Sequence, residues 1–230
     1  MRLASSGNWR GAGMQVGRAV SGLLFGLSRG PVMLYNGQEV GEPAAGREGF
    51  GGDDGRTSIF DYWSMPELQK WVNGGAFDGG QLSQAQKDLR AFYARLVALR
   101  GEPAFQEGGF VPLNAANAQN ASFGRLSGET ASGHWLYAYA RHTDAQRFVV
   151  VVNLHPTETL RGVRVVLGAP ALKAMGIPFE GADAGVRWSL TDRLGPVGAA
   201  SATAGELANG GVTLADLPPL TSAYFELKKQ

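Results

Sequence analysis

The sequence contains no cysteine and only three histidines. The absence of cysteine excludes disulfides, thiolate metal ligands and a cysteine nucleophile. His134, His142 and His155 do not form a close pair, so they lack the spacing of a metal site. We therefore predict no metal and no cofactor.

The sequence also has no excess of charge and no long hydrophobic run. Its 21 Lys and Arg residues nearly balance its 20 Asp and Glu residues, and no basic cluster exceeds Lys228 and Lys229. A basic surface for nucleic acid is therefore not expected. The longest apolar stretch, residues 19–27, is interrupted by a serine and two glycines and is far shorter than the roughly 20 residues that span a bilayer. We predict neither a nucleic-acid partner nor a membrane span, and we interpret this stretch as part of the fold rather than as a signal peptide.

Glycine, by contrast, is abundant, with 34 residues that separate patterned segments. Residues 14–28 carry apolar side chains at spacings of three and four, which predicts a helix. The glycines within it weaken the helix but allow it to lie close to a sheet. Residues 31–35 are apolar on both faces, as in a strand buried in a parallel sheet, and Asn36 and Gly37 predict a turn after it.

Residues 38–80 are mostly loop and contain both acidic and aromatic side chains. A loop of this length inside a compact domain is either functional or a sign that the assignment of elements is wrong, and the acidic, aromatic and glycine residues favour a functional loop. Residues 66–72 predict one short helix within it, with a proline in the first turn. The next helix is predicted over residues 82–99, where Ser83 and Gln86 can form a capping box.

From about residue 104 the pattern changes to that of short strands. Residues 135–139 alternate, and residues 148–152 are continuously apolar. Further short apolar runs follow at residues 163–167, 186–190 and 223–227. Their even spacing predicts an all-β antiparallel sandwich.

The order of elements before residue 104 is helix, buried strand, long loop and helix. This order is typical of the last unit of a (β/α)8 barrel, in which the loop lies at the carboxyl end of the strand where such enzymes keep their active sites. The predicted fold is therefore an α/β remnant of a (β/α)8 TIM barrel, residues 1–103, followed by an all-β antiparallel sandwich domain, residues 104–230.

Two segments resemble a known family. Residues 30–41 (GPVMLYNGQEVG) resemble the eighth strand of the α-amylase family, glycoside hydrolase family 13, and residues 53–63 (DDGRTSIFDYW) resemble the loop that follows it. Residues 71–73, the helix up to Arg100 and the strand that ends in residues 152–154 are also similar. The resemblance covers nearly the whole chain and is most specific over residues 30–100.

The resemblance implies retaining hydrolysis or transfer of α-glucosidic oligo- or polysaccharides, with an α-glucan or maltooligosaccharide as substrate of the full enzyme. The family's nucleophilic Asp, acid Glu and Asn-His-Asp triplet have no counterpart here, whereas residues 1–5 resemble the segment just after that triplet. A full barrel takes roughly 250 residues. We therefore expect a carboxyl-terminal part of such an enzyme, without catalytic residues and inactive alone.

The resemblance also places five residues near the bound sugar: Arg56, Glu39, Asp54, Tyr62 and Arg2. The planar guanidinium of Arg56 suits bidentate contacts to sugar hydroxyls, and a salt bridge to Asp54 or Asp61 is an equally good interpretation. Tyr62 can stack on a sugar or serve as a packing anchor. For Glu39 we expect a buried acid that accepts hydrogen bonds from loop backbone or from an arginine.

A hypothesis from a different class is a stand-alone carbohydrate-binding or interaction β-sandwich module. Its binding platform would consist of aromatic side chains on one face of a strand, namely Trp135, Tyr137 and Tyr139. A platform of this kind requires that this face of the strand be exposed.

Overall fold

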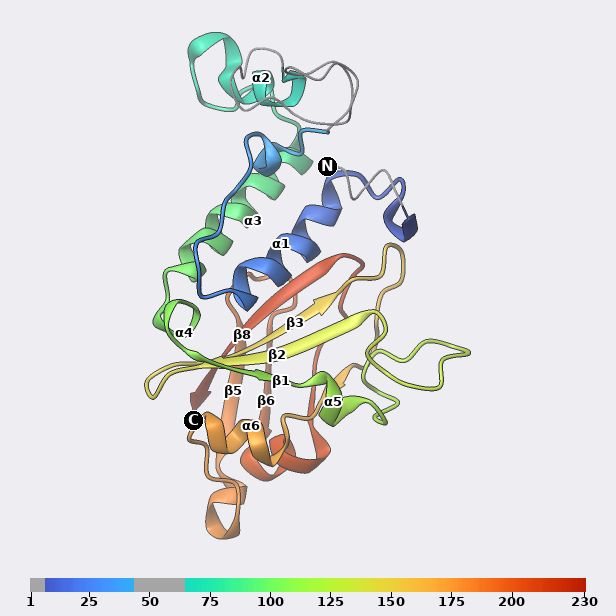
Figure 1. Ribbon diagram of the computed structural model, residues 1–230, viewed down its shortest axis with the longest axis vertical. Coiled ribbons are helices and arrows are strands. Elements are labelled where there is room, and N and C mark those ends of the chain that lie inside the picture. The colour runs from blue at the N-terminus through green and yellow to red at the C-terminus, as the bar shows by residue number, and fades with distance from the viewer. Residues whose placement is uncertain (1–6, 44–64) are drawn as a thin grey trace.

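The computed structural model of the chain describes residues 7–43 and 65–230. Its centre is a six-stranded antiparallel sheet with the strand order β1-β2-β3-β8-β5-β6 (Figure 1). The strands are β1 (Gly109–Pro112), β2 (Leu136–His142), β3 (Arg147–Asn153), β5 (Arg187–Asp192), β6 (Ala199–Thr203) and β8 (Thr221–Lys229). A separate two-stranded antiparallel sheet pairs β4 (Arg164–Val165) with β7 (Val212–Thr213).

Helices cover both faces of the sheet. They are α1 (Val16–Leu27), α2 (Pro66–Val72), α3 (Gln84–Arg100), α4 (Pro103–Gln106), α5 (Asn114–Asn117) and α6 (Gly168–Ala174). Short 3-10 turns are η2 (Gly7–Trp9), η3 (Gly13–Gln15), η4 (Gln38–Val40), η7 (Asn73–Gly75) and η8 (Gly181–Gly185), and η9 (Glu206–Gly210) is a π turn. The three helices predicted at residues 14–28, 66–72 and 82–99 are confirmed as α1, α2 and α3. The strands predicted after residue 104 are also confirmed.

The sheet is buried on both faces by two hydrophobic clusters. On β3, Val149 and Val151 belong to the first cluster, which also contains side chains of α6, η9, β4 and β7. Phe148 and Val150 belong to the second cluster, which contains side chains of α1, α3 and α4. This double burial explains why the β3 sequence is continuously apolar rather than alternating.

The antiparallel character of this part is confirmed, but two features of the predicted fold are not found. The β part contains one large sheet whose second face is covered by helices, rather than two large sheets packed face to face (Figure 1). Every paired strand in the described residues is antiparallel, so these residues show no unit of a (β/α)8 barrel. The barrel and the boundary near residue 104 stay predictions.

The strand predicted at residues 31–35 is wrong for this structure, because these residues form no ladder with any described strand. A strand exists only through hydrogen bonds to a neighbour, and apolar composition alone does not supply one. Val32 and Leu34 instead pack against the second cluster, whereas Met33 is 80% exposed. The Arg100 Nη2 donates to the Gly30 carbonyl at 2.9 Å and holds the start of the segment against the end of α3.

Glycines allow α1 to lie directly on β3 and β8, as the sequence predicts. A Cβ atom on Gly22 would lie 2.1 Å from the Ser222 Oγ, and one on Gly26 would lie 2.0 Å from the Tyr139 hydroxyl oxygen. Ser222 donates from its hydroxyl to the Arg18 carbonyl at 2.9 Å, and the Tyr224 hydroxyl donates to the Gly22 carbonyl. Any larger residue at these two positions would separate the helix from the sheet.

Arg141, on β2, joins two helices to the sheet through their carboxyl ends. Its side chain is 1% exposed, and its Nη1 donates to the Gly26 and Leu27 carbonyls at 3.3 and 3.0 Å. Its Nε donates to the Ala104 carbonyl at 3.1 Å. Its Nη2 donates to the Phe105 and Gly108 carbonyls at 3.3 and 3.1 Å. Burial lowers the pKa of Arg141, yet a guanidinium remains charged at physiological pH and suits the negative end of a helix dipole.

We predict that Gly26→Ala destabilises the chain by about 1–3 kcal/mol, because the added methyl group overpacks the contact with Tyr139. Chemical denaturation monitored by circular dichroism measures the change. Gly185→Ala is the matched control, since its Cβ would meet nothing within 4 Å. Equal stabilities of the two variants would contradict the close contact.

We also predict that Arg141→Met lowers the free energy of unfolding by at least about 3 kcal/mol, because five buried carbonyl contacts lose their charged donor. Arg161→Met is the control, since Arg161 is largely exposed and pairs with Asp216 at the surface. Its effect should stay below about 1 kcal/mol. A similar loss in both variants would refute a structural role specific to Arg141.

Candidate functional site

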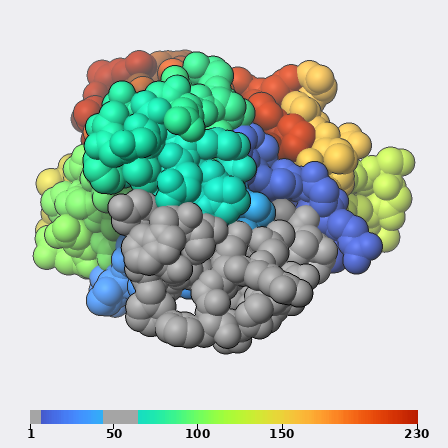
Figure 2. Space-filling model, turned by 90° about the horizontal axis from the view of Figure 1, so that it is seen from above, coloured from blue at the N-terminus to red at the C-terminus, as the bar shows by residue number. Residues whose placement is uncertain are grey.

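Residues 37–41, the last part of the first family-like segment, lie at one end of the molecule, where η4, α2 and the beginning of α3 meet (Figure 1). Figure 2 looks onto this end, where α2 and the start of α3 form a continuous surface. Of the five predicted sugar-binding residues, Glu39 lies here on η4. Arg2, Asp54, Arg56 and Tyr62 fall outside the described residues, so their roles stay predictions.

Two glycines of the motif shape η4. Gly37 and Gly41 flank this turn with φ values of 78° and 77°, which is the left-handed region that glycine adopts without strain. A Cβ atom on Gly37 would lie 2.8 Å from the Glu42 Cβ, and one on Gly41 would lie 2.7 Å from the Met14 Cβ. Backbone conformation and close packing therefore both require glycine at these positions.

A buried polar network fixes η4 to both long helices. The Gln38 Nε2 donates to the Ser21 Oγ on α1 and to the Tyr93 hydroxyl on α3, at 2.8 Å each. These two hydroxyls are also within 2.8 Å of each other. Burial raises the pKa of Tyr93, and the nearby Glu39 raises it further, so the phenol remains neutral and can donate. The network holds the motif in one position relative to α1 and α3.

Glu39 in the motif and Glu42 directly after it have different environments. Glu39 is half-buried, and within residues 7–43 and 65–230 no hydrogen bond reaches its carboxylate. Glu42 is the buried acid that accepts backbone hydrogen bonds: its Oε2 accepts from the Glu67 and Leu68 N–H groups at 2.8 and 3.0 Å. The structural role expected for Glu39 therefore belongs to Glu42, and the Glu39 carboxylate stays available at the turn.

Glu42 caps α2 from a distance of 25 residues in sequence. The side chain of Met65, the N-cap residue of this helix, accepts no hydrogen bond from the first N–H groups of the helix. A carboxylate there satisfies two of those groups and complements the positive end of the helix dipole. This missing cap is the signal in the sequence from which an acid elsewhere could have been inferred.

The start of α3 completes the anchoring. Ser83 and Gln86 form the predicted capping box, since each side chain bonds the other's backbone N–H. The Gln86 Nε2 also donates to the Val40 carbonyl at 3.0 Å and to the Glu67 Oε2 at 2.6 Å. Gln86, the second residue of the capping box, therefore also links η4 to α2.

An aromatic corner lies beside these anchors. The Trp71 ring packs edge to face with Phe77, at 5.7 Å between centroids, and the Arg90 guanidinium lies 5.2 Å from its centroid. A hollow of about 200 Å³ is lined by Trp71, Asp78 and Arg90, among others. A hydrogen bond from the Asn73 side chain, together with the Gly80 N–H, lowers the pKa of Asp78 and keeps this carboxylate ionised.

The aromatic platform of the alternative hypothesis is wrong in part. Tyr139 is fully buried, because its face of β2 is covered by α1, and burial raises the pKa of its phenol well above the usual value. Tyr137 and Trp135 are half-buried, and Trp135 packs against His155 at 4.7 Å between ring centroids. The alternating pattern of residues 135–139 predicted which side chains share a face of β2, but it did not predict that α1 covers this face.

The described part of the chain contains no group of three or more His, Asp or Glu side chains able to hold a metal ion. None of its helices has both the length and the apolar character needed to cross a bilayer.

We predict that Glu42→Ala destabilises the chain by about 1–3 kcal/mol, because two backbone N–H groups at the start of α2 lose their acceptor. Glu39→Ala should change stability by less than about 0.5 kcal/mol. Chemical denaturation of both variants tests the assignment. A larger loss in the Glu39 variant would reverse the two roles.

No protein-family model matches the chain, and no curated protein matches it by sequence. Solved structures do match: AmyP in complex with maltotriose has a TM-score of 0.48 and 16% identity, covering 93% of this chain and 34% of AmyP. An Anoxybacillus α-amylase has a TM-score of 0.47 and 17% identity over 94% of this chain and 32% of its own. An isomaltulose synthase from Erwinia rhapontici has a TM-score of 0.41 and 14% identity over 97% and 39% of the two chains.

The chain thus spans about a third of the length of the first of these structures. The structures to which it is similar include α-amylases.

Proposed function

We propose that the chain is the carboxyl-terminal part of an α-amylase-type retaining glycoside hydrolase or transglycosylase that acts on α-linked glucose oligo- or polysaccharides. The observation that carries the proposal is the motif of residues 30–41, because its positions Gly37, Gln38 and Gly41 each have a structural use. Gly37 and Gly41 require left-handed backbone, and Gln38 joins α1 to α3. The structural uses of these residues therefore argue against a chance similarity of the motif sequence.

Within such an enzyme, this part would position the substrate rather than cleave the bond. Retaining cleavage needs two carboxyl groups about 5–5.5 Å apart, one as nucleophile and one as acid and base. The Glu42 carboxylate caps α2, whereas the carboxylate of the motif acid Glu39 accepts no hydrogen bond within the described residues. One acid does not make the pair.

Glu39 would then border the sugar site, together with Arg56, Asp54, Tyr62 and Arg2. An arginine contributes here through paired hydrogen bonds to adjacent hydroxyls, and a tyrosine through ring contact with a sugar face. The proposed ligand is an α-glucan or maltooligosaccharide, and one of the similar solved structures holds maltotriose.

The uncovered apolar surface near the motif supports the proposal that further polypeptide covers it. Leu24 on α1 is 56% exposed, and Met33, within residues 31–35, is 80% exposed. Large apolar side chains that are this exposed are compatible with an interface. In the proposed enzyme this surface would contact the preceding units of the barrel.

The test compares the chain alone with the protein read from its gene together with the upstream coding sequence. The chain alone should release no reducing sugar from maltoheptaose, because it contains no nucleophile and acid pair. The longer protein should be active, and Arg56→Lys in it should raise KM about tenfold, by loss of roughly 1.4 kcal/mol of bidentate binding. Lys70→Ala, an exposed residue of α2 paired with Glu67, is the control and should leave KM unchanged.

Sugar release by the chain alone, abolished by Glu39→Gln, would overturn the proposal. An upstream sequence without the three acidic motifs in any frame would remove its basis. Binding of maltoheptaose by the chain, with no activity in the longer protein, would favour the carbohydrate-binding module.

A further inference from the structure

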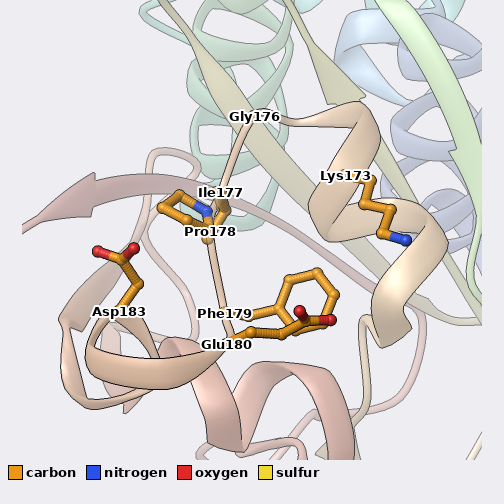
Figure 3. A pocket seen from close by; sticks show the side chains of 7 residues that line it. All are labelled: Lys173, Gly176, Ile177, Pro178, Phe179, Glu180 and Asp183. Carbon is orange, nitrogen blue, oxygen red and sulfur yellow. The ribbon is translucent and has the colours of Figure 1, made fainter.

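A hollow of about 470 Å³ lies at the opposite end of the molecule from η4 and α2. It is formed by the end of α6, the segment that follows it and η8, and its lining includes Lys173, Ile177, Phe179, Glu180 and Asp183 (Figure 3). Its volume is in the range of about 300–1,000 Å³ that small-molecule sites occupy. We propose that this hollow is a saccharide-binding site, which binds a neutral oligosaccharide.

The floor of the hollow is fixed by the core. Ile177 is buried in the first cluster, and Phe179 packs against the same cluster while remaining half-exposed. The Ile177 N–H donates to the Leu172 carbonyl at 2.9 Å, which continues the end of α6. The site therefore offers one partly exposed aromatic ring in a preformed position, and a ring of this kind can contact the C–H face of a pyranose.

The segment above the floor is also anchored to the sheet. Gly176 adopts a left-handed conformation with a φ of 64°, which ends the helix and turns the chain into the hollow. Arg147 on β3 donates from its Nε to the Met175 carbonyl at 2.6 Å. Its guanidinium also lies 5.7 Å from the centroid of the buried Trp188 ring. A ligand would therefore meet a rigid wall, which reduces the entropy lost on binding.

The charged side chains of the hollow have unused hydrogen-bonding capacity. Lys173, Glu180 and Asp183 form no side-chain hydrogen bond or ion pair within the described residues. Figure 3 shows Phe179 and Glu180 projecting to one side of the segment and Asp183 lying on its other side. The hollow thus presents acceptors on both sides of the chain and one ammonium donor at its rim.

These groups together favour a neutral polyhydroxylated ligand. Two carboxylates beside one ammonium group disfavour phosphate and other anions by repulsion. Sugar hydroxyls can donate to the carboxylates and accept from Lys173, while the C–H face of the ring covers Phe179. The identification of the ligand as an α-linked glucose oligosaccharide rests on the proposed function. The existence of a saccharide site in this hollow does not depend on it.

The experiment is a titration of the full ¹⁵N-labelled chain with maltoheptaose, followed by amide chemical shifts. Shifts should concentrate in residues 173–183, with a Kd in the millimolar range. The double variant Glu180→Gln with Asp183→Asn should weaken binding at least tenfold, because both carboxylates lose their charge. Both residues are exposed, so that folding should be unaffected, which thermal unfolding verifies.

Phe179→Ala should also weaken binding at least tenfold, and its matched control is Phe110→Ala, an exposed aromatic residue on the edge strand β1. The charge control is Glu107→Gln, an exposed acid outside the hollow. Neither control should change the Kd by more than twofold.

The proposed site would be refuted if no amide chemical shift changed up to about 10 mM maltoheptaose. Shifts confined to the aromatic corner around Trp71, or unchanged binding in the double variant, would also refute it. Binding of cellohexaose or xylohexaose but not maltoheptaose would overturn the α-glucan ligand and leave the site. Failure of the hydrolysis assay would overturn the proposed enzyme activity alone, since this titration requires no turnover.

Discussion

The structure depends on the close approach of α1 to the sheet. The strand β3 is apolar on both faces, and its neighbour β8 places Ser222 and Tyr224 on the side of α1, so that this face would be exposed to water unless a helix covered it. α1 covers it with a surface of glycines, which brings backbone carbonyls within hydrogen-bonding distance of Ser222, Tyr139 and Tyr224. Hydrophobic burial drives this packing, and the paired hydroxyls remove the cost of burying polar groups in it.

The position of the candidate site follows from this packing. α3 packs beside α1, and the Gln38 network is formed between them. Because η4 is attached to both helices, and α2 is attached to η4 through Glu42, the sheet orients the motif across several layers. The β part is therefore the support on which the site residues are held.

The sequence predicted those elements whose signals are local. The capping box of Ser83 and Gln86, the helical spacing of residues 14–28 and the strands after residue 104 need no distant partner to be recognised. The errors concern partners that are distant in sequence. A strand at residues 31–35 needs a neighbouring strand, exposure of Tyr139 depends on α1, and the cap of α2 comes from Glu42. Arg141 is the clearest omission, since a charged residue in a strand is usually taken to be exposed.

The acceptors of Arg141 are all main-chain carbonyls. A contact of this kind specifies where two helices end but not which side chains they carry. Substitutions in α1 and α4 can therefore accumulate without altering the joint, provided that the helices keep their length and the glycines keep the spacing. Insertion or deletion of a single residue in either helix would rotate its last carbonyls by about 100° away from the guanidinium. Sequences that preserve this contact of Arg141 can therefore vary widely in the composition of α1 and α4, but hardly at all in the lengths of these helices.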